Sequence, residues 1–123
     1  MSEIRIENAR ITSTMLGIED HGILTAQVTV EGHGWGVSFG GYALDSYVKS
    51  RDLRIGTAYG LTFVMRVMET VGVSKWESLK GQFVRVKSDG LGRPCIAIGH
   101  LIEDKWFDPK TDELLKSLAG GAA

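Results

Sequence analysis

A short stretch ahead of the longest helical pattern holds residues that could bind an anion. Arg54, Gly56 and Thr57 come directly before apolar residues that recur at helical spacing. The first backbone N–H groups of a helix lack partners within the helix, and its dipole is positive there, so an open helix start attracts phosphate. Thr57 could instead cap the helix, with the glycines in turns. For this stretch taken alone, capping is the favoured interpretation.

A second candidate site lies on a predicted strand near residue 85. Side chains alternate in direction along a strand, so if Val84 and Val86 face the core, then Phe83, Arg85 and Lys87 face outward. A flat ring that stacks on a base, beside cations that bind phosphate, is what a nucleotide-like ligand requires.

The strand predicted to pair with it would leave room for such a ligand. Cys95, Ala97 and Gly99 are small and share the outward phase, and Arg93 enters beside the turn. Small residues opposite Phe83 predict a concavity. The alternative is that this face packs under another element or a second subunit, with the aromatic ring as ordinary core. Both interpretations stay open.

Signals for catalysis or metal binding are weak. The histidines are far apart, and none belongs to a pair at zinc-ligand spacing: His21, His33 and His100. The chain lacks a nucleophile elbow, a complete phosphate-binding loop and a dinucleotide-binding motif. A lone Cys95 on a strand is typical of a buried, inert thiol. Asp104 and Asp108 could hold a metal or act as a base, but Asp108 is better explained as a helix cap. We expect a binding protein and not an enzyme, with no metal and no cofactor.

The composition indicates one domain over residues 1–123. A chain of 123 residues with 43% hydrophobic content can form its own core. The formal net charge of -1 gives no global attraction to nucleic acid polymers or anionic membranes. One cysteine, no signal-peptide pattern and no apolar run of about 20 residues favour a soluble cytosolic protein.

Strand patterns dominate the first third of the sequence. Residues 4–18 predict one long strand, or two with a bulge, followed by a turn at residues 19–22. Strict alternation predicts a strand from Ile23 to Glu31, and a third strand begins at Trp35. These strands form an antiparallel meander.

Three helices and a hairpin are expected in the rest of the chain. The central helix ends near Gly72, and its predicted core face is Leu61, Val64, Met65, Met68 and Val71. A capping box at residues 74–77 predicts a short helix to about residue 80. Residues 82–87 and 94–100 predict a second hairpin, and Asp108-Pro109 predicts the start of a tail helix. The fold class is α+β: an antiparallel β meander, one central helix, a second β-hairpin and a short C-terminal helix.

Several blocks occur in one order along nearly the whole chain: residues 6–11, 16–23, 39–45, 54–60, 76–81 and 104–109. Together they resemble the phage Thoeris anti-defence proteins of the first type. That family sequesters the cyclic ADP-ribose isomers made by bacterial TIR-domain immune enzymes. The family's base-stacking aromatic falls on Phe83. Arg93 stands where the family has a polar amide, so the preferred isomer is left open.

The resemblance implies a sponge that encloses glycocyclic ADP-ribose without cleaving it. It also implies a homodimer or hexamer in the host cytoplasm, with a possible separate site for cyclic oligonucleotides. A hydrolase of such a signal, or an assembly protein without a small ligand, are the alternatives. The candidate ligand-binding residues are Phe83, Arg85, Arg93, Gly40, Gly41, Tyr42, Arg54, Gly56, Thr57 and Ala58.

Overall fold

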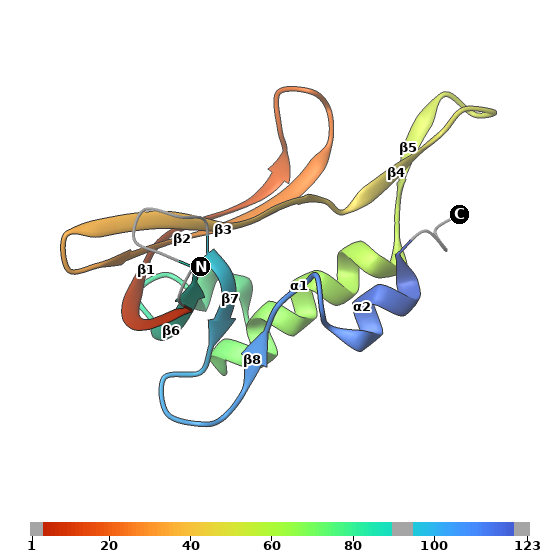
Figure 1. The fold of residues 1–123 in the computed structure, drawn as a ribbon. Coiled ribbons are helices and arrows are strands. Elements are labelled where there is room, and N and C mark those ends of the chain that lie inside the picture. The colour runs from red at the N-terminus through yellow and green to blue at the C-terminus, as the bar shows by residue number, and fades with distance from the viewer. Residues whose placement is uncertain (1–3, 90–94, 120–123) are drawn as a thin grey trace.

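The computed structural model describes residues 4–89 and 95–119 and has the predicted α+β class (Figure 1). Its main sheet has six antiparallel strands in the order β3-β2-β1-β6-β7-β8. Their bounds are Arg5–Ile18 for β1, Leu24–Gly32 for β2, Trp35–Ala43 for β3, Phe83–Ser88 for β6, Cys95–Gly99 for β7 and Trp106–Phe107 for β8. The sheet curls, so β3 also approaches β7, which is not its neighbour in the strand order.

The predicted meander is confirmed. β1 is one long strand whose pairing with β2 shifts register between Ile11 and Ser13, which is the expected bulge. In β2, Ala26, Val28 and Val30 are buried, as the alternation predicts. The predicted second hairpin is also present, since β6 and β7 pair antiparallel. Pairing of β1 with β6 joins the meander and the hairpin into one sheet.

Helix α1, Ala58–Val71, packs on the concave side of this sheet. Thr57 caps its start, and Gly72 closes it in the left-handed conformation, both as predicted. Of the predicted core face only Val71 is buried, and the other buried residues of the helix are Gly60, Phe63, Val67 and Thr70. The phenyl ring of Phe63 lies 6.1 Å from that of Phe39 and 5.5 Å from that of Phe107. The large ring decides which side of the helix faces the core, and Leu61 is left 67% exposed.

Residues 45–56, for which the sequence predicted no strand, form a separate hairpin. Strands β4, Asp45–Val48, and β5, Leu53–Gly56, pair with each other and project from the body as an arm (Figure 1). All residues of β5 are exposed and those of β4 are at most half-buried as whole residues, although the side chain of Asp45 at the base of the arm is covered.

Two further helix predictions need correction. Residues 76–78 form only a 3-10 turn, and Lys75, not Ser74, stands at its start with no side-chain cap. The tail helix α2 is Glu113–Leu118 and is capped by Asp112, not by Asp108. Asp108 instead closes the turn before it, accepting a hydrogen bond from the backbone N–H of Lys110. No helix in residues 4–89 and 95–119 is long and apolar enough to cross a lipid bilayer.

Candidate functional site

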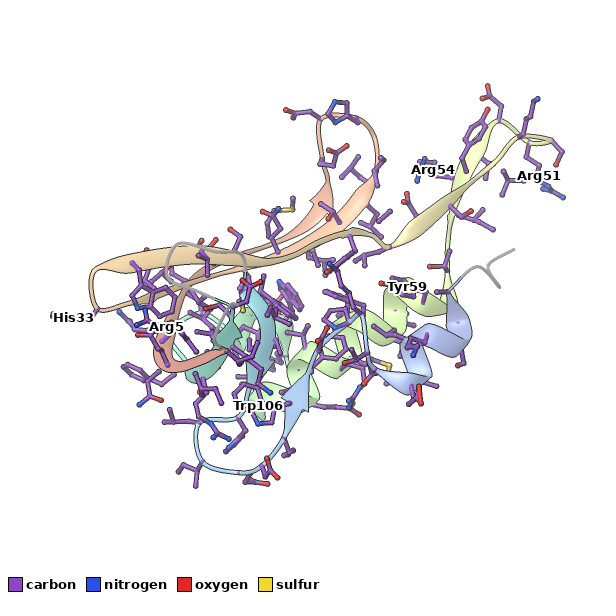
Figure 2. The ribbon with its side chains drawn as sticks, in the orientation of Figure 1. Arg5, His33, Arg51, Arg54, Tyr59 and Trp106 are labelled. Atoms are coloured by element: carbon purple, nitrogen blue, oxygen red, sulfur yellow. The ribbon has the colours of Figure 1, made fainter. Side chains whose placement is uncertain are left out.

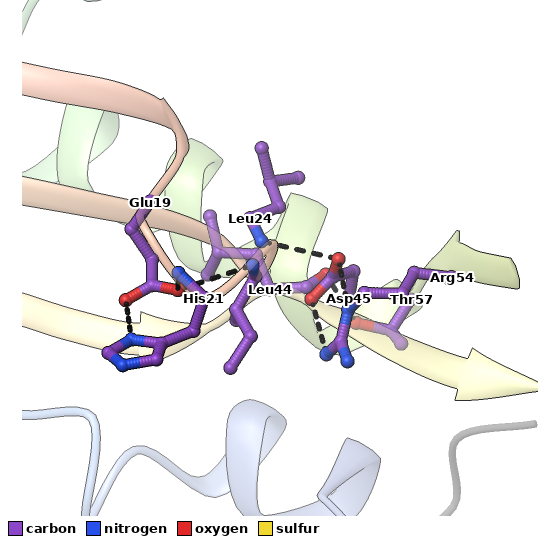
Figure 3. Close-up of polar contacts among 8 residues, drawn as sticks. Glu19, His21, Leu24, Leu44, Asp45, Arg54 and Thr57 are labelled. Atoms are coloured by element: carbon purple, nitrogen blue, oxygen red, sulfur yellow. Dashed lines mark hydrogen bonds and ion pairs between the residues drawn. The ribbon is translucent and has the colours of Figure 1, made fainter.

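The groups at the start of α1 have partners within the protein (Figure 3). The guanidinium of Arg54 donates two hydrogen bonds to the carboxylate of Asp45, at 2.8 and 2.9 Å. The Thr57 hydroxyl donates to the carbonyl of Leu44 and accepts from the N–H of Gly60, both at 2.9 Å. Arg54 also lowers the pKa of the Asp45 carboxyl. The arginine charge is therefore compensated, and the capping interpretation of Thr57 is confirmed.

The surroundings of this helix start are apolar. Gly56, Thr57 and Ala58 line a groove of about 550 Å³ together with Leu16, Leu24, Leu44, Gly60, Leu61 and Val64. None of the described residues that line the groove is charged, and apolar walls suit an apolar partner better than a phosphate.

A more polar cavity of about 370 Å³ lies at the seam where β3 approaches β7. We call it the seam pocket, and it is lined by Ser38, Gly40, Tyr42, Asp89, Cys95, Ile96 and Lys110. Two sequence-predicted residues, Gly40 and Tyr42, are among these. Arg93 lies outside the described residues. This volume is within the range of small-molecule sites.

The backbone at Gly40 is specialised. Its φ is 107°, and a Cβ there would come within 2.5 Å of the carbonyl oxygen of Ala26. Gly41 also has a positive φ of 87°. These glycines let β3 approach β2 across a break in register between Thr25 and Gln27. Gly40 lines the seam pocket but supplies no side chain to it, and Gly41 is not among the lining residues.

Tyr42 gives the seam pocket an aromatic side chain. Its ring centroid lies 5.8 Å from that of Phe63, so the core holds the ring in place. Burial, assisted by the charge of Asp108, raises the pKa of the Tyr42 hydroxyl, which therefore stays protonated at neutral pH. No described residue hydrogen-bonds or ion-pairs with the side chains of Ser38, Tyr42 or Lys110. Two hydroxyls and one ammonium are thus available to a ligand.

Phe83 faces outward on β6, as predicted, with 58% of its surface exposed. Its partner across the β1–β6 pairing is Arg10, whose side chain shares that outer face. The alternation argument could have found Arg10, because it has the opposite phase to the buried residues Ala9 and Ile11. An exposed ring beside a guanidinium can stack on a base and pair with a phosphate.

The predicted concavity near Arg85 is filled by the protein itself. Trp106 of β8, labelled in Figure 2, lies over Gly99. The guanidinium of Arg85 lies 4.7 Å and the ammonium of Lys87 4.4 Å from its ring. Arg85 also donates hydrogen bonds of 2.8 Å to the carbonyls of His100 and Glu103. The alternative that this face packs under another element is therefore confirmed for Arg85 and Lys87, while Phe83 stays exposed. The covering element, strand β8, was not predicted. Arg85 therefore stabilises the β7–β8 loop.

The candidate residues are divided among three places. Gly40, Gly41 and Tyr42 belong to the seam, Phe83 and Arg85 lie on the outer face of β6, and residues 54–58 lie at the helix start. Lys110 was missed, since it lies after Asp108-Pro109 in a turn with no distinguishing pattern.

The Cys95 thiol lies in the wall of the seam pocket and is poorly suited to nucleophilic attack. Burial raises its pKa to about 11, and its Sγ lies 3.2 Å from the carbonyl oxygen of Ala97. Among residues 4–89 and 95–119, no three His, Cys, Asp or Glu side chains are grouped so that they could hold a metal ion.

Comparisons with protein-family models, with curated proteins and with solved structures found no match for this chain.

Proposed function

We propose that this chain is a phage anti-defence protein that binds and sequesters a cyclic nucleotide immune signal in the host cytoplasm without cleaving it. Glycocyclic ADP-ribose is the leading ligand, and a cyclic oligonucleotide is a second one. The observation that carries the proposal is the seam pocket, whose Tyr42, Ser38 and Lys110 side chains have no partner among the described residues. An aromatic ring, hydroxyls and a cation match the base, ribose and phosphate groups of a nucleotide.

The exposed ring of Phe83 supports the same ligand class from a second position. Phe83 begins β6, and Asp89 of the seam pocket follows the end of that strand. Six residues of strand span roughly 20 Å, so one copy does not place both features on one small ligand. Enclosure therefore requires a homodimer or a larger assembly such as a hexamer, in which one copy's Phe83 meets another's pocket. No nucleic acid polymer, membrane, metal or cofactor takes part.

The decisive experiment separates a sponge from a hydrolase. The protein is incubated with glycocyclic ADP-ribose and then denatured, and the released nucleotide is analysed by mass spectrometry. Recovery of the intact cyclic molecule is expected, and a linear product would establish hydrolysis instead. No binding of any cyclic nucleotide would contradict both.

Lys110 provides a matched test of the seam pocket. Lys110→Glu places a negative charge beside the ligand's phosphates and should weaken binding about tenfold or more. Lys105→Glu, at an exposed lysine outside the seam pocket, serves as the control and should bind as the wild type does. Equal affinity of the two variants, measured by calorimetric titration, would remove Lys110 from the site.

A further inference from the structure

The arm formed by β4 and β5 has one apolar face that nothing in the described chain buries. The strand pairing places Val48 opposite Leu53 and Ser46 opposite Ile55, so these side chains share one face. Tyr47 and Arg54 form the other face. An isolated two-stranded hairpin is marginally stable in water unless its apolar face is covered. The arm therefore requires a partner for this face.

The groove at the start of α1 is a second unpartnered apolar surface. It lies between the base of the arm and the β1–β2 hairpin, and both project from the same side of the body (Figure 1). Leu61 is 67% exposed beside it, and Ile18 near the hairpin tip is 66% exposed. Exposed apolar residues grouped in this way mark an interaction surface.

The charges at the two tips are complementary. The arm carries Lys49, Arg51 and Asp52, of which Asp52 accepts a hydrogen bond from Tyr47, and Arg51 lies at its far end (Figure 2). The turn of the β1–β2 hairpin carries Asp20 and Glu19, and Glu19 pairs with His21 at 3.0 Å. Neither Lys49, Arg51 nor Asp20 forms an ion pair with another described residue. A basic tip on one hairpin and an acidic tip on the other suit each other.

We propose that the apolar face of the arm of a second copy of this chain binds in the groove of the first copy. Each copy then inserts its arm between the β1–β2 hairpin and α1 of the other. A twofold axis makes the exchange reciprocal, so both unpartnered surfaces of both copies are buried at once. Lys49 and Arg51 of each arm lie against the acidic turn of the other copy, which fixes the direction of docking. This assignment deepens the proposed homo-oligomer by naming its contact surface, and it is tested without nucleotide.

Sedimentation equilibrium of the full chain across micromolar concentrations tests the apolar contact. Leu61→Glu and Leu53→Glu, one on each surface, should each raise the dissociation constant of the dimer about tenfold or more. The control is Ile102→Glu, at a residue 82% exposed in the β7–β8 loop, and it should associate as the wild type does. Circular dichroism checks that all variants are folded. A monomeric wild type, or an unchanged constant in either surface variant, overturns the proposal.

Charge variants test the direction of docking. Lys49→Glu/Arg51→Glu makes the arm acidic, and Asp20→Lys neutralises the facing turn, so each variant alone should dimerise more weakly. A mixture of the two restores one native pairing of arm and turn per mixed dimer, and should associate more tightly than either variant alone. Failure of mixing to strengthen association rejects the arrangement. Nucleotide binding by the wild type is measured separately. If the protein dimerises through the arm but binds no nucleotide, the proposed function alone is contradicted. If it binds nucleotide but assembles without the arm, this inference alone is contradicted.

Discussion

The indole of Trp106 lies directly over Gly99 on the outer face of the sheet. A Cβ at position 99 would come within 2.6 Å of the indole ring. Arg85 and Lys87 hold the same ring from the neighbouring strand. The packing of Arg85 and Lys87 of β6 and Trp106 of β8 therefore requires that residue 99 of β7 have no Cβ.

Gly99→Ala should therefore destabilise the fold. The added methyl group must displace Trp106 from between two cations, and overpacking of this kind costs about 1 to 3 kcal/mol. Gly56→Ala is the matched control, because a Cβ there meets nothing within 4 Å. Urea denaturation of both variants measures the difference, and equal midpoints would show that Trp106 moves aside at little cost.

Phe83→Ala should weaken ligand binding and leave stability nearly unchanged. A base-stacking contact is worth about 1 to 3 kcal/mol, which corresponds to a roughly 5- to 150-fold loss of affinity. Phe63→Ala, in the buried aromatic cluster, should instead cost about 3 to 5 kcal/mol of folding free energy. For each variant, a ligand titration measures the affinity and a thermal denaturation scan measures the stability. A large fall in the melting temperature of Phe83→Ala, with affinity retained, would place its ring in the core and outside any binding site.

Reversal of charge at Arg54 should be costly. The sequence made Arg54 a candidate anion-binding residue, but the structure pairs it with Asp45, whose side chain is only 6% exposed. Arg54→Glu leaves that carboxylate without its partner and adds a like charge, a loss of about 1 to 3 kcal/mol. Arg5→Glu, at an exposed arginine without an ion pair among the described residues, should change stability little. Chemical denaturation at pH 7 compares the two.

The same ion pair predicts a pH dependence of stability. Arg54 lowers the pKa of Asp45 in the folded protein below the ordinary value of 3.8. The Asp45 carboxyl therefore binds a proton more readily in the unfolded chain than in the folded protein. The stability that the ion pair contributes is present above pH 3.8 and is lost as the pH falls through the lower pKa of the folded protein. Asp45→Asn should lack this part of the acid dependence. Denaturation of both proteins from pH 7 to pH 3 measures it, and parallel curves would contradict the assignment.

Local patterns predicted most of the strands because burial on one face imposes a period of two. Ala26, Val28 and Val30 are buried, and Phe83 is exposed, as this period requires. The helix end at Gly72 and the helix cap at Thr57 could also be predicted from the sequence, since each depends only on hydrogen bonds to residues a few positions away.

Features that depend on distant contacts were not predicted. Helix α1 has two apolar sides, and only the rings of Phe39 and Phe107, brought close by the curled sheet, select the side that carries Phe63. Likewise, Trp106 covers Gly99 only because a two-residue strand forms at the end of a loop. The seam pocket requires β3 and β7 to meet, which no local pattern encodes.

The bulge in β1 gives one strand two independent surfaces. Before it, the residues with odd numbers, Ala9 and Ile11, face the core. After it, the residues with even numbers pair with the inward-facing ones, as Leu16 does with Ala26. The single inserted residue thus acts as a phase shift: Arg10, before it, faces outward beside Phe83, and Leu16, after it, faces the groove on the opposite side. A substitution at an even-numbered position therefore alters the outer face when it lies before the bulge, and the core-facing side when it lies after the bulge.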